Sequence, residues 1–567
     1  MDELDLVIRG GTVADGTGAP LRVADIGVRD GAIVAVGDIA APATRTVDAS
    51  GLLVAPGWVD VHTHYDGQST WDSRLTPSTW HGVTTVVTGN CGVGFAPVHT
   101  DAHQALIELM EGVEDIPGTA LHAGLSWNWE TFAEYLDAVD ARPHDADVAA
   151  QVPHGALRLF VMGERGASGA EATPDDIAAM GRIAREAMEA GALGFSTSRT
   201  KNHRTSTGAY TPTLRAGADE LVGIAAEIGR SGRGVLQVVS DFESPAEELS
   251  LFEAMMRASG RPLSISLAQN HRAADSWRHV VAAIEHYRAE GLEMRAQVAV
   301  RPIGILIGLQ ATVNPLAESP TFRALAAGDL ELAVLAQRLR APDVRTAVLG
   351  ELSETTRARW ERQGVYVLGP VPDYEPAPES SITAQARRRG LEPSELLYDE
   401  LVAGDGTALL YVPILNFANG DLDHVREMLQ HPFCVPGLSD GGAHVGTICD
   451  ASFPTTLLQH WGRDRERGTL PIPVLVAQQT RNTARSVGLD DRGALLPGLR
   501  ADINVVDLDA LTVEAPYMAF DLPAGGKRLL QRARGYRHTF VHGVETYRDG
   551  EFTGALPGRL VRGLASA

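Results

Sequence analysis

The sequence contains little cysteine, with only three residues of this type in 567: Cys91, Cys434 and Cys449. An odd and sparse set in a chain of this length argues against a disulfide framework. Cys434 lies in an apolar run, and neither it nor Cys449 has a histidine at metal-binding spacing, so packing is the expected role of both. The chain is expected to fold around a large buried core instead of through cross-links.

Long hydrophobic runs are also missing, since no segment approaches the roughly 20 apolar residues that a membrane-spanning helix needs. A hydrophobic content of 44% and a charged content of 21% are typical of a folded, water-soluble protein. The first residues, MDELDLVIRGGTV, are acidic and show a strand pattern, whereas a secretory signal needs a basic start followed by an apolar stretch. We therefore expect a cytoplasmic protein that does not insert into a membrane.

Positive charge is scarce, because 49 lysines and arginines stand against 72 acidic residues and give a net charge of −23. Nucleic acids and anionic membranes are bound by lysines and arginines clustered on one face. These two classes of partner are disfavoured, and a small-molecule ligand is expected.

Both ends of the chain carry short runs that alternate apolar and polar residues and are separated by glycine-rich turns. DLVIRGGTV and ADIGVRDGAIVAVG are examples from the first end, and ADINVVDLDALTV and HTFVHGVETYRDGEF from the last. Such alternation is typical of half-buried antiparallel strands. We predict a small β-sandwich domain formed from residues 1–57 and 490–567.

The middle of the chain, residues 58–489, alternates apolar strand-like runs with long amphipathic segments such as TPDDIAAMGRIAREAMEAGA and ADELVGIAAEIGRSG. This pattern indicates repeating βα units. Eight strands are predicted, at residues 57–64, 82–90, 147–154, 192–199, 234–240, 262–269, 293–300 and 433–440. The count favours an α/β fold of the (β/α)₈ TIM barrel type, in which the active site lies at the carboxyl ends of the strands. Residues 300–430 are too long for a βα connection and are expected to form an insertion or lid.

His62 and His64 end the first predicted strand. Residues two apart in a strand point to the same side, so both imidazoles should lie at one mouth of the barrel and could share a cation. Asp440 ends the eighth strand, and closure of the barrel would bring its carboxylate beside them. The alternatives are a hydrogen-bonded pair of histidines and a turn or N-cap aspartate before Gly441 and Gly442.

Four segments together resemble the amidohydrolase superfamily: PGWVDVHTH after the β unit, GVTTVVTGNCG, SDGGAH and LPGLRADINVVD. Within it, TGNCG is similar to the D-aminoacylase (N-acyl-D-amino-acid deacylase) branch, in which a cysteine after the second strand ligates zinc. The resemblance implies that Cys91 joins His62, His64 and Asp440 as a ligand, and a thiolate is a good zinc ligand. An inert buried thiol is the alternative.

The chain departs from this branch at the ends of strands five and six, where the family has histidines that complete a second metal site. The matching positions are Val239 and Leu267, which cannot bind a metal. A shift of register would bring in other residues, namely Gln237, Asp241, Gln269 or His271. We predict one cation and not two, with Zn²⁺ favoured and Mn²⁺ or Fe²⁺ as alternatives.

Other polar residues at predicted strand ends are candidates for substrate contact. Histidine can stabilise a transition state and arginine can hold a carboxylate by two hydrogen bonds. Gln269 stands where the resemblance places a substrate-holding lysine. The candidates are His154, Arg199, His203, Gln269, Arg301 and His444. Ordinary hydrogen bonding, salt bridging or support of Asp440 are the alternative roles.

The expected reaction is hydrolysis of an amide, with Asp440 as the group that accepts and returns the proton. The resemblance implies an N-acyl amino acid as substrate, including one of D configuration. The same cation site could serve another amide, a cyclic amide or a formamide. A binding protein that has lost catalysis is the alternative from another class. Barrels of this kind often self-associate, so a homo-oligomer is a further expectation.

Overall fold

The computed structural model describes residues 3–328 and 330–563. Its centre is an eight-stranded parallel sheet, and all eight predicted strands take part in it. In the order of the sheet they are β6 (Trp58–Asp60), β7 (Val83–Thr88), β8 (Asp147–Pro153), β9 (Gly194–Arg199), β10 (Val235–Ser240), β11 (Leu263–Leu267), β12 (Met294–Val298) and β16 (Cys434–Pro436). The predicted barrel fold is confirmed.

The sheet closes on itself beyond the ends of its first and last strands. The backbone N–H of Asp440 donates to the carbonyl of His62 at 3.1 Å, and that of His64 donates to the carbonyl of Gly441 at 2.8 Å. These two bonds place the segment after β16 beside the segment after β6. Closure therefore brings His62, His64 and Asp440 to the same mouth of the barrel.

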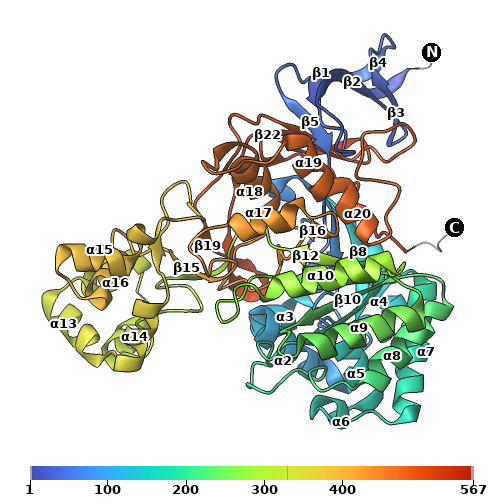
Figure 1. Ribbon diagram of the computed structural model, residues 1–567. Helices are drawn as coiled ribbons and strands as arrows, with labels where there is room; N and C mark the ends of the chain where they lie inside the picture. The colour runs from blue at the N-terminus through green and yellow to red at the C-terminus, as the bar shows by residue number, and fades with distance from the viewer. Residues whose placement is uncertain (1–2, 329, 564–567) are drawn as a thin grey trace.

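Helices cover the outside of the barrel (Figure 1). The main ones are α4 (Phe132–Asp140), α5 (His154–Met162), α7 (Pro174–Ala190), α8 (Ala218–Arg230), α9 (Pro245–Ser259), α10 (Ser276–Ala289) and α17 (Asp423–Gln430). The two amphipathic segments singled out in the sequence form α7 and α8. Thr173 and Asp176 make a capping box at the start of α7, and Gly191 ends it with a φ of 112° that glycine adopts without strain. Among the described helices, none is long and apolar enough to span a membrane.

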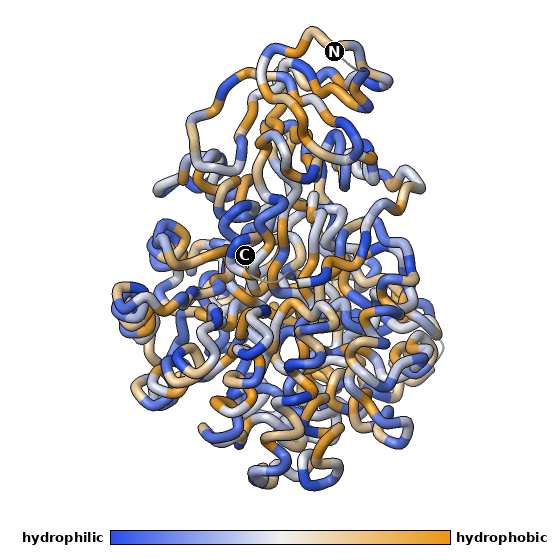
Figure 2. Tube along the Cα trace, turned by 90° about the vertical axis from the view of Figure 1, so that its right-hand side faces the viewer, coloured by the Kyte–Doolittle hydropathy of each residue, from blue (hydrophilic) through white to orange (hydrophobic). Residues whose placement is uncertain are grey.

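Strands from both ends of the chain form one nine-stranded sheet, which lies at the top of the molecule in Figure 1. In the side view of Figure 2 the N-terminus lies at the same end. They are β1 (Leu4–Val13), β2 (Arg22–Arg29), β3 (Ala32–Gly37), β4 (Ala43–Asp48), β5 (Leu53–Pro56), β17 (Ile503–Val506), β22 (Tyr536–Val541), β23 (Val544–Arg548) and β24 (Glu551–Phe552). The two halves meet where β5 pairs antiparallel with β17. Apolar side chains from both halves, such as Ile8, Val54, Ile503 and Phe540, share one core. The domain boundaries at 57/58 and 489/490 stay predictions.

The long segment between β12 and β16 forms a lobe beside the barrel, drawn in yellow in Figure 1. Its elements are β13 (Ile303–Ile307), α11 (Pro320–Ala326), α12 (Leu332–Leu339), α13 (Pro342–Glu351), α14 (Glu354–Arg362), β14 (Tyr366–Val367), α15 (Ile382–Arg389), α16 (Pro393–Leu401) and β15 (Leu410–Leu415). β13 pairs antiparallel with β15, so the chain enters and leaves the lobe side by side. Apolar residues including Leu339, Tyr398 and Val412 give the lobe its own core.

A buried ion network joins the barrel to the C-terminal segment. The carboxylate of Asp147, at the start of β8, accepts hydrogen bonds from Arg492 at 2.7 Å and from Arg500 at 2.9 Å. The side chains of Asp147 and Arg492 are both almost fully buried. Removing one partner of a buried pair leaves the other charge without its compensation, which is strongly destabilising.

We expect Arg492→Met to lower the free energy of unfolding by about 3 kcal/mol, because Asp147 would keep only Arg500 as a charged partner. Urea titration followed by circular dichroism measures this loss. Arg485→Met is the control, since Arg485 faces Asp490 on the surface at 3.6 Å and such pairs contribute less than about 1 kcal/mol. An equal effect of both substitutions would contradict the assigned role of the network.

Candidate metal centre

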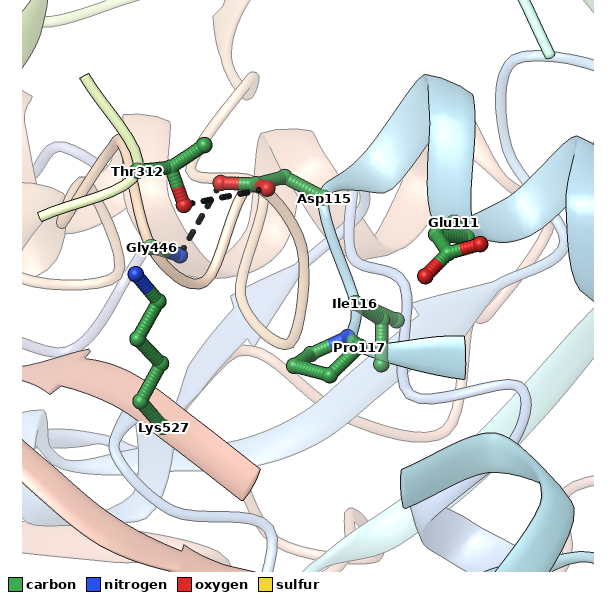
Figure 3. A pocket seen from close by; sticks show the side chains of 7 residues that line it. All are labelled: Glu111, Asp115, Ile116, Pro117, Thr312, Gly446 and Lys527. Carbon is green, nitrogen blue, oxygen red and sulfur yellow. Dashed lines mark hydrogen bonds between the residues drawn. The ribbon is translucent and has the colours of Figure 1, made fainter. Parts of the chain in front are cut away.

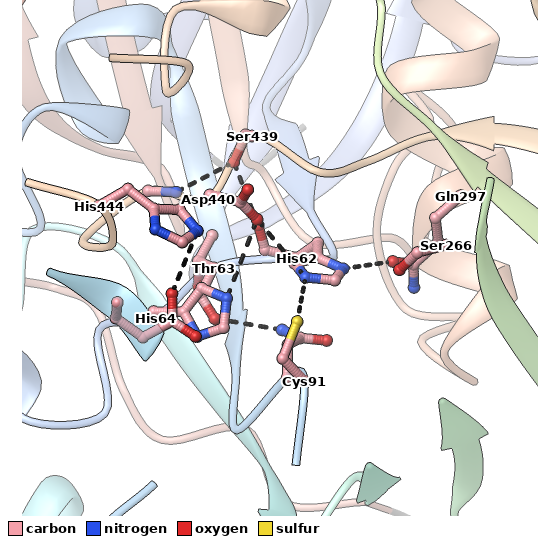
Figure 4. Close-up of polar contacts among 12 residues, drawn as sticks. His62, Thr63, His64, Cys91, Ser266, Gln297, Ser439, Asp440 and His444 are labelled. Carbon is pink, nitrogen blue, oxygen red and sulfur yellow. Dashed lines mark hydrogen bonds and ion pairs between the residues drawn. The ribbon is translucent and has the colours of Figure 1, made fainter. Parts of the chain in front are cut away.

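Figure 4 shows four side chains that converge at the mouth of the barrel. The Nε2 of His62 lies 3.3 Å from the Sγ of Cys91 and 3.5 Å from the Oδ1 of Asp440. The Nε2 of His64 lies 3.8 Å from the same carboxylate oxygen. Donor atoms of His62, His64 and Cys91 all lie within 4.8 Å of one another. The four residues predicted as ligands are thus brought together, and we call them the cation cradle.

The backbone at Cys91 and Asp440 is in the left-handed region, with φ of 55° and 49°. Non-glycine residues adopt this conformation rarely, and at a cost. Cys91 follows β7, and its N–H donates to the Oε1 of Gln237 on β10 at 3.2 Å. Asp440 is held by its N–H bond to His62. Each strained residue is therefore held by a hydrogen bond to another segment of the barrel, and the side chains of both belong to the cradle.

The protonation states of these groups suit a cation. Burial lowers the pKa of His62, and that of His64 falls further, so both rings are neutral and able to ligate. Burial, reinforced by the negative charges of Glu114 and Asp440, raises the pKa of the Cys91 thiol well above its usual value. A nearby cation would favour the thiolate.

Both ring nitrogens of His64 are buried and have no hydrogen-bond partner in the described part of the chain. Buried polar atoms without a partner are rare in native proteins and call for an explanation. Two neutral imidazoles, a thiol and a carboxylate are the donor types that zinc prefers. The residues present therefore fit a bound divalent cation.

Gln297 on β12 supports His62 and was not predicted. The Nδ1–H of His62 donates to the Oε1 of Gln297 at 2.6 Å, while the Nε2 of Gln297 donates to Ser264 at 3.1 Å. An acceptor at Nδ1 selects the tautomer that turns the Nε2 lone pair toward the cradle. A polar residue inside the apolar run of a predicted strand was the only signal in the sequence.

Glu114, the last residue of α2 (His103–Glu114), was also missed. Its side chain is 1% exposed, and its Oε1 lies 3.3 Å from the Nδ1 of His64. Burial, together with the charges of Asp440 and Asp66, raises the pKa of Glu114 well above its usual value. Nothing in the sequence marks this glutamate among its acidic neighbours on the helix.

Two of the predicted substrate contacts lie near the cradle. The Nε2 of His444 lies 3.4 Å from the Oε2 of Glu114. The ring of His203 is bonded through Nδ1 to Ser198 at 3.0 Å. Burial, with smaller contributions from His444 and His62, lowers the pKa of His203 to about 3. Both histidines therefore lie at the rim of the site.

Two arginines predicted as substrate contacts are held by acidic partners. Arg199 forms an ion pair with Glu248 at 2.7 Å. Arg301 is buried against Asp450 at 2.9 Å and lies over the ring of Tyr374. Their guanidinium groups are thus neutralised within the protein, and a structural role accounts for each of them.

His154 and Gln269 are likewise engaged elsewhere. His154 is fully buried between Thr197 at 2.8 Å and Glu220 at 2.9 Å, under the helices that cover the barrel. The Oε1 of Gln269 accepts from the N–H of Ala418 at 2.9 Å, where the chain returns from the lobe. The structure does not bring either side chain into the cradle.

The positions expected to carry histidines in a second metal site offer no ligand. Leu267 is buried within the apolar core, and Val239 is partly buried and packs against that core. The carboxylate of Asp241 is occupied by Thr200 at 2.5 Å and by the N–H of Lys201 at 2.8 Å. Within residues 3–328 and 330–563, His62, His64 and Cys91 form the one group of three or more potential ligands.

Known proteins resemble this chain over nearly its whole length. Residues 45–551 match the amidohydrolase family. D-aminoacylase of Alcaligenes xylosoxydans xylosoxydans is 30% identical over 98% of this chain and 97% of its own. N-acyl-D-glutamate deacylase of the same organism is 30% identical over 100% of this chain and 98% of its own.

Solved structures agree with these sequence relatives. N-acyl-D-glutamate deacylase of Bordetella bronchiseptica, complexed with zinc and a phosphonate inhibitor, has a TM-score of 0.65 and 26% identity, covering 99% of this chain and 100% of that one. A D-aminoacylase with a binuclear metal centre also has a TM-score of 0.65 and 26% identity, covering 99% of this chain and 100% of that one. In that protein one metal is described as activating and the second as attenuating. The chain belongs to the amidohydrolase family and, within it, to the D-aminoacylase-like branch.

Proposed function

We propose that this protein is a metal-dependent amidohydrolase that removes the acyl group from an N-acyl amino acid. The observation that carries the proposal is the cradle, in which side chains from three distant segments surround one point at the barrel mouth. The curated relatives include a D-aminoacylase, an N-acyl-D-glutamate deacylase and an N-acyl-D-aspartate deacylase. Their names favour a substrate of D configuration.

We infer that the cradle holds a single Zn²⁺, with Mn²⁺ or Fe²⁺ as alternatives. Two nitrogen donors, one sulfur donor and one oxygen donor suit zinc. One cation is favoured over two because Val239 and Leu267 are apolar and pack against or within the core. When bound, the cation would polarise the amide carbonyl and lower the pKa of a water molecule.

We assign the proton transfer and the stabilisation of the transition state to different residues of the chain. Asp440 is the most exposed member of the cradle, with 13% of its side chain accessible. Its carboxylate accepts the proton of the attacking water and returns it to the leaving nitrogen. His203 and His444 lie at the rim, where a ring N–H can stabilise the oxygen that becomes negative. An amino acid and a carboxylic acid are the products.

The test is a hydrolysis screen on zinc-loaded protein, with N-acetyl-D- and N-acetyl-L-amino acids beside cyclic amides. We expect amine release from the N-acyl amino acids and one equivalent of zinc by elemental analysis. If the protein binds zinc fully but cleaves no amide, it is a binding protein and not an enzyme. If it cleaves cyclic amides alone, the substrate class is cyclic amides and not N-acyl amino acids. Gel filtration of the same preparation tests the homo-oligomer, which stays a prediction, as does the cytoplasmic location.

A further inference from the structure

The last turn of α2 contacts both the metal ligand His64 and the loop that carries Asp440. The two carboxylate oxygens of Glu114 face two different imidazoles, with Oε1 3.3 Å from the Nδ1 of His64 and Oε2 3.4 Å from the Nε2 of His444. The side chain of Glu114 is almost fully buried. One carboxylate therefore lies between a ligand in the cradle and a histidine at its rim.

Glu114 and His64 have few other polar neighbours. In the described part of the chain, neither carboxylate oxygen of Glu114 and neither ring nitrogen of His64 makes a hydrogen bond, so the contacts at 3.3 Å and 3.4 Å are ion-pair contacts. A buried carboxylate without a donor is costly, so a partner with an N–H is expected at each oxygen. The two imidazoles are the groups in place to supply them.

The position of Glu114 is fixed by contacts that do not involve its own side chain. Its carbonyl accepts the N–H of His444. The next residue, Asp115, leaves the helix with a φ of 53° and accepts from the N–H of Gly446 at 3.2 Å and from Thr447 at 2.5 Å. Figure 3 shows the carboxylate of Asp115 facing both Gly446 and Thr312, and all three residues line a cavity of about 70 Å³. The end of α2 is thus docked onto the loop after Asp440.

We propose that Glu114 is a positioning residue that accepts the Nδ1–H of His64, turns the Nε2 of that ring toward the cradle, and holds His444 at the rim. The inference rests on the metal site of the proposed function. It gives His64 the same kind of support that Gln297 gives His62, with one difference. His62 is backed by a neutral amide and His64 by a carboxylate, and a carboxylate makes the ring a stronger donor to a cation.

The test measures cation binding and does not depend on turnover. Glu114→Gln keeps the shape of the side chain and removes the carboxylate, whose charged form a bound cation favours. We expect the Zn²⁺ dissociation constant, measured by calorimetry, to rise roughly tenfold to a hundredfold. We also expect the visible absorption bands of the Co²⁺-loaded protein to shift, because the geometry at His64 changes.

Glu111→Gln is the matched control. Glu111 lies three residues earlier on the same helix, and its Oε1 accepts from the N–H of Gly118 at 2.8 Å, away from the cradle. Its substitution should leave the affinity and the Co²⁺ spectrum as in the wild type. An unchanged affinity and spectrum in Glu114→Gln, or an equal loss in Glu111→Gln, would overturn the proposal.

A crystal structure of the zinc-loaded wild-type protein tests the contact between Glu114 and His64 without a substitution. We expect the Oε1 of Glu114 within hydrogen-bonding distance of the Nδ1 of His64. A carboxylate bound directly to zinc, or turned away to water, would overturn the proposal. Failure of the proposed function has a different signature, namely wild-type protein that binds zinc normally and cleaves no amide.

Discussion

Replacing Asp440 by asparagine is expected to lower kcat by roughly 10³-fold or more, because the amide cannot accept the proton of the attacking water. Asparagine has nearly the same shape as aspartate and tolerates the left-handed φ of 49° found at this position. The fold should therefore survive, as circular dichroism would show. Steady-state kinetics on an N-acyl amino acid measures the loss.

Asp241→Asn is the matched control for this prediction. Asp241 follows β10 near the barrel mouth, but its carboxylate is bonded to Thr200 and Lys201 and does not face the cradle. Its substitution should change kcat by less than a factor of about ten. Losing a structural hydrogen bond has an effect of this size, whereas losing the proton acceptor has a much larger one. Full activity of Asp440→Asn, or an equal loss at Asp241, would refute the role given to Asp440.

Replacing Cys91 by alanine is expected to remove most bound zinc. Its Sγ lies 3.3 Å from the Nε2 of His62, and the remaining ligands would be two imidazoles and one carboxylate. Because Cys91 contributes the thiolate, its loss also removes a proton that zinc must displace on binding. Wild-type zinc binding should therefore strengthen as pH rises, and the variant should lose part of this dependence. Elemental analysis and calorimetry at several pH values measure both effects.

Cys434→Ala provides the control, since Cys434 is also buried but lies on β16 and is not among the potential ligands. This variant should keep its zinc and lose only a little stability, as expected when a small buried side chain is shortened. Undiminished zinc in Cys91→Ala would show that the thiol is a packing residue.

The barrel and its cradle were predictable because they follow from local pattern and closure. Each of the eight apolar runs is a strand in the structure. The predicted alternation along a strand put His62 and His64 on one side. In the structure both residues follow β6 (Trp58–Asp60) instead of ending it, but closure of the barrel still brings them beside Asp440. Cys91 came from the resemblance of TGNCG to a known branch, since strand geometry alone does not select it.

The surroundings of the cradle were not predictable in the same way. A charged residue at a strand end looks available for substrate, but its neutralising partner can be far away in the sequence. Arg199 is paired with Glu248, and Arg301 with Asp450. Glu114 shows the converse, because the carboxylate that reaches His64 comes from a helix whose sequence carries several similar acids. Such pairings depend on how helices pack on the barrel, and one sequence does not contain that information.

The sheet built from both ends of the chain has a consequence for synthesis on the ribosome. The first five strands emerge early, but one edge of β5 (Leu53–Pro56) is completed only by β17 (Ile503–Val506). Until then the nascent chain carries an unpaired strand edge, which is a template for pairing with other chains. The barrel, whose residues lie between β5 and β17 in the sequence, can assemble before β17 is made. The beginning of the chain is therefore among the last parts to reach its final structure. Nascent chains released before residue 503 should therefore depend most on chaperones.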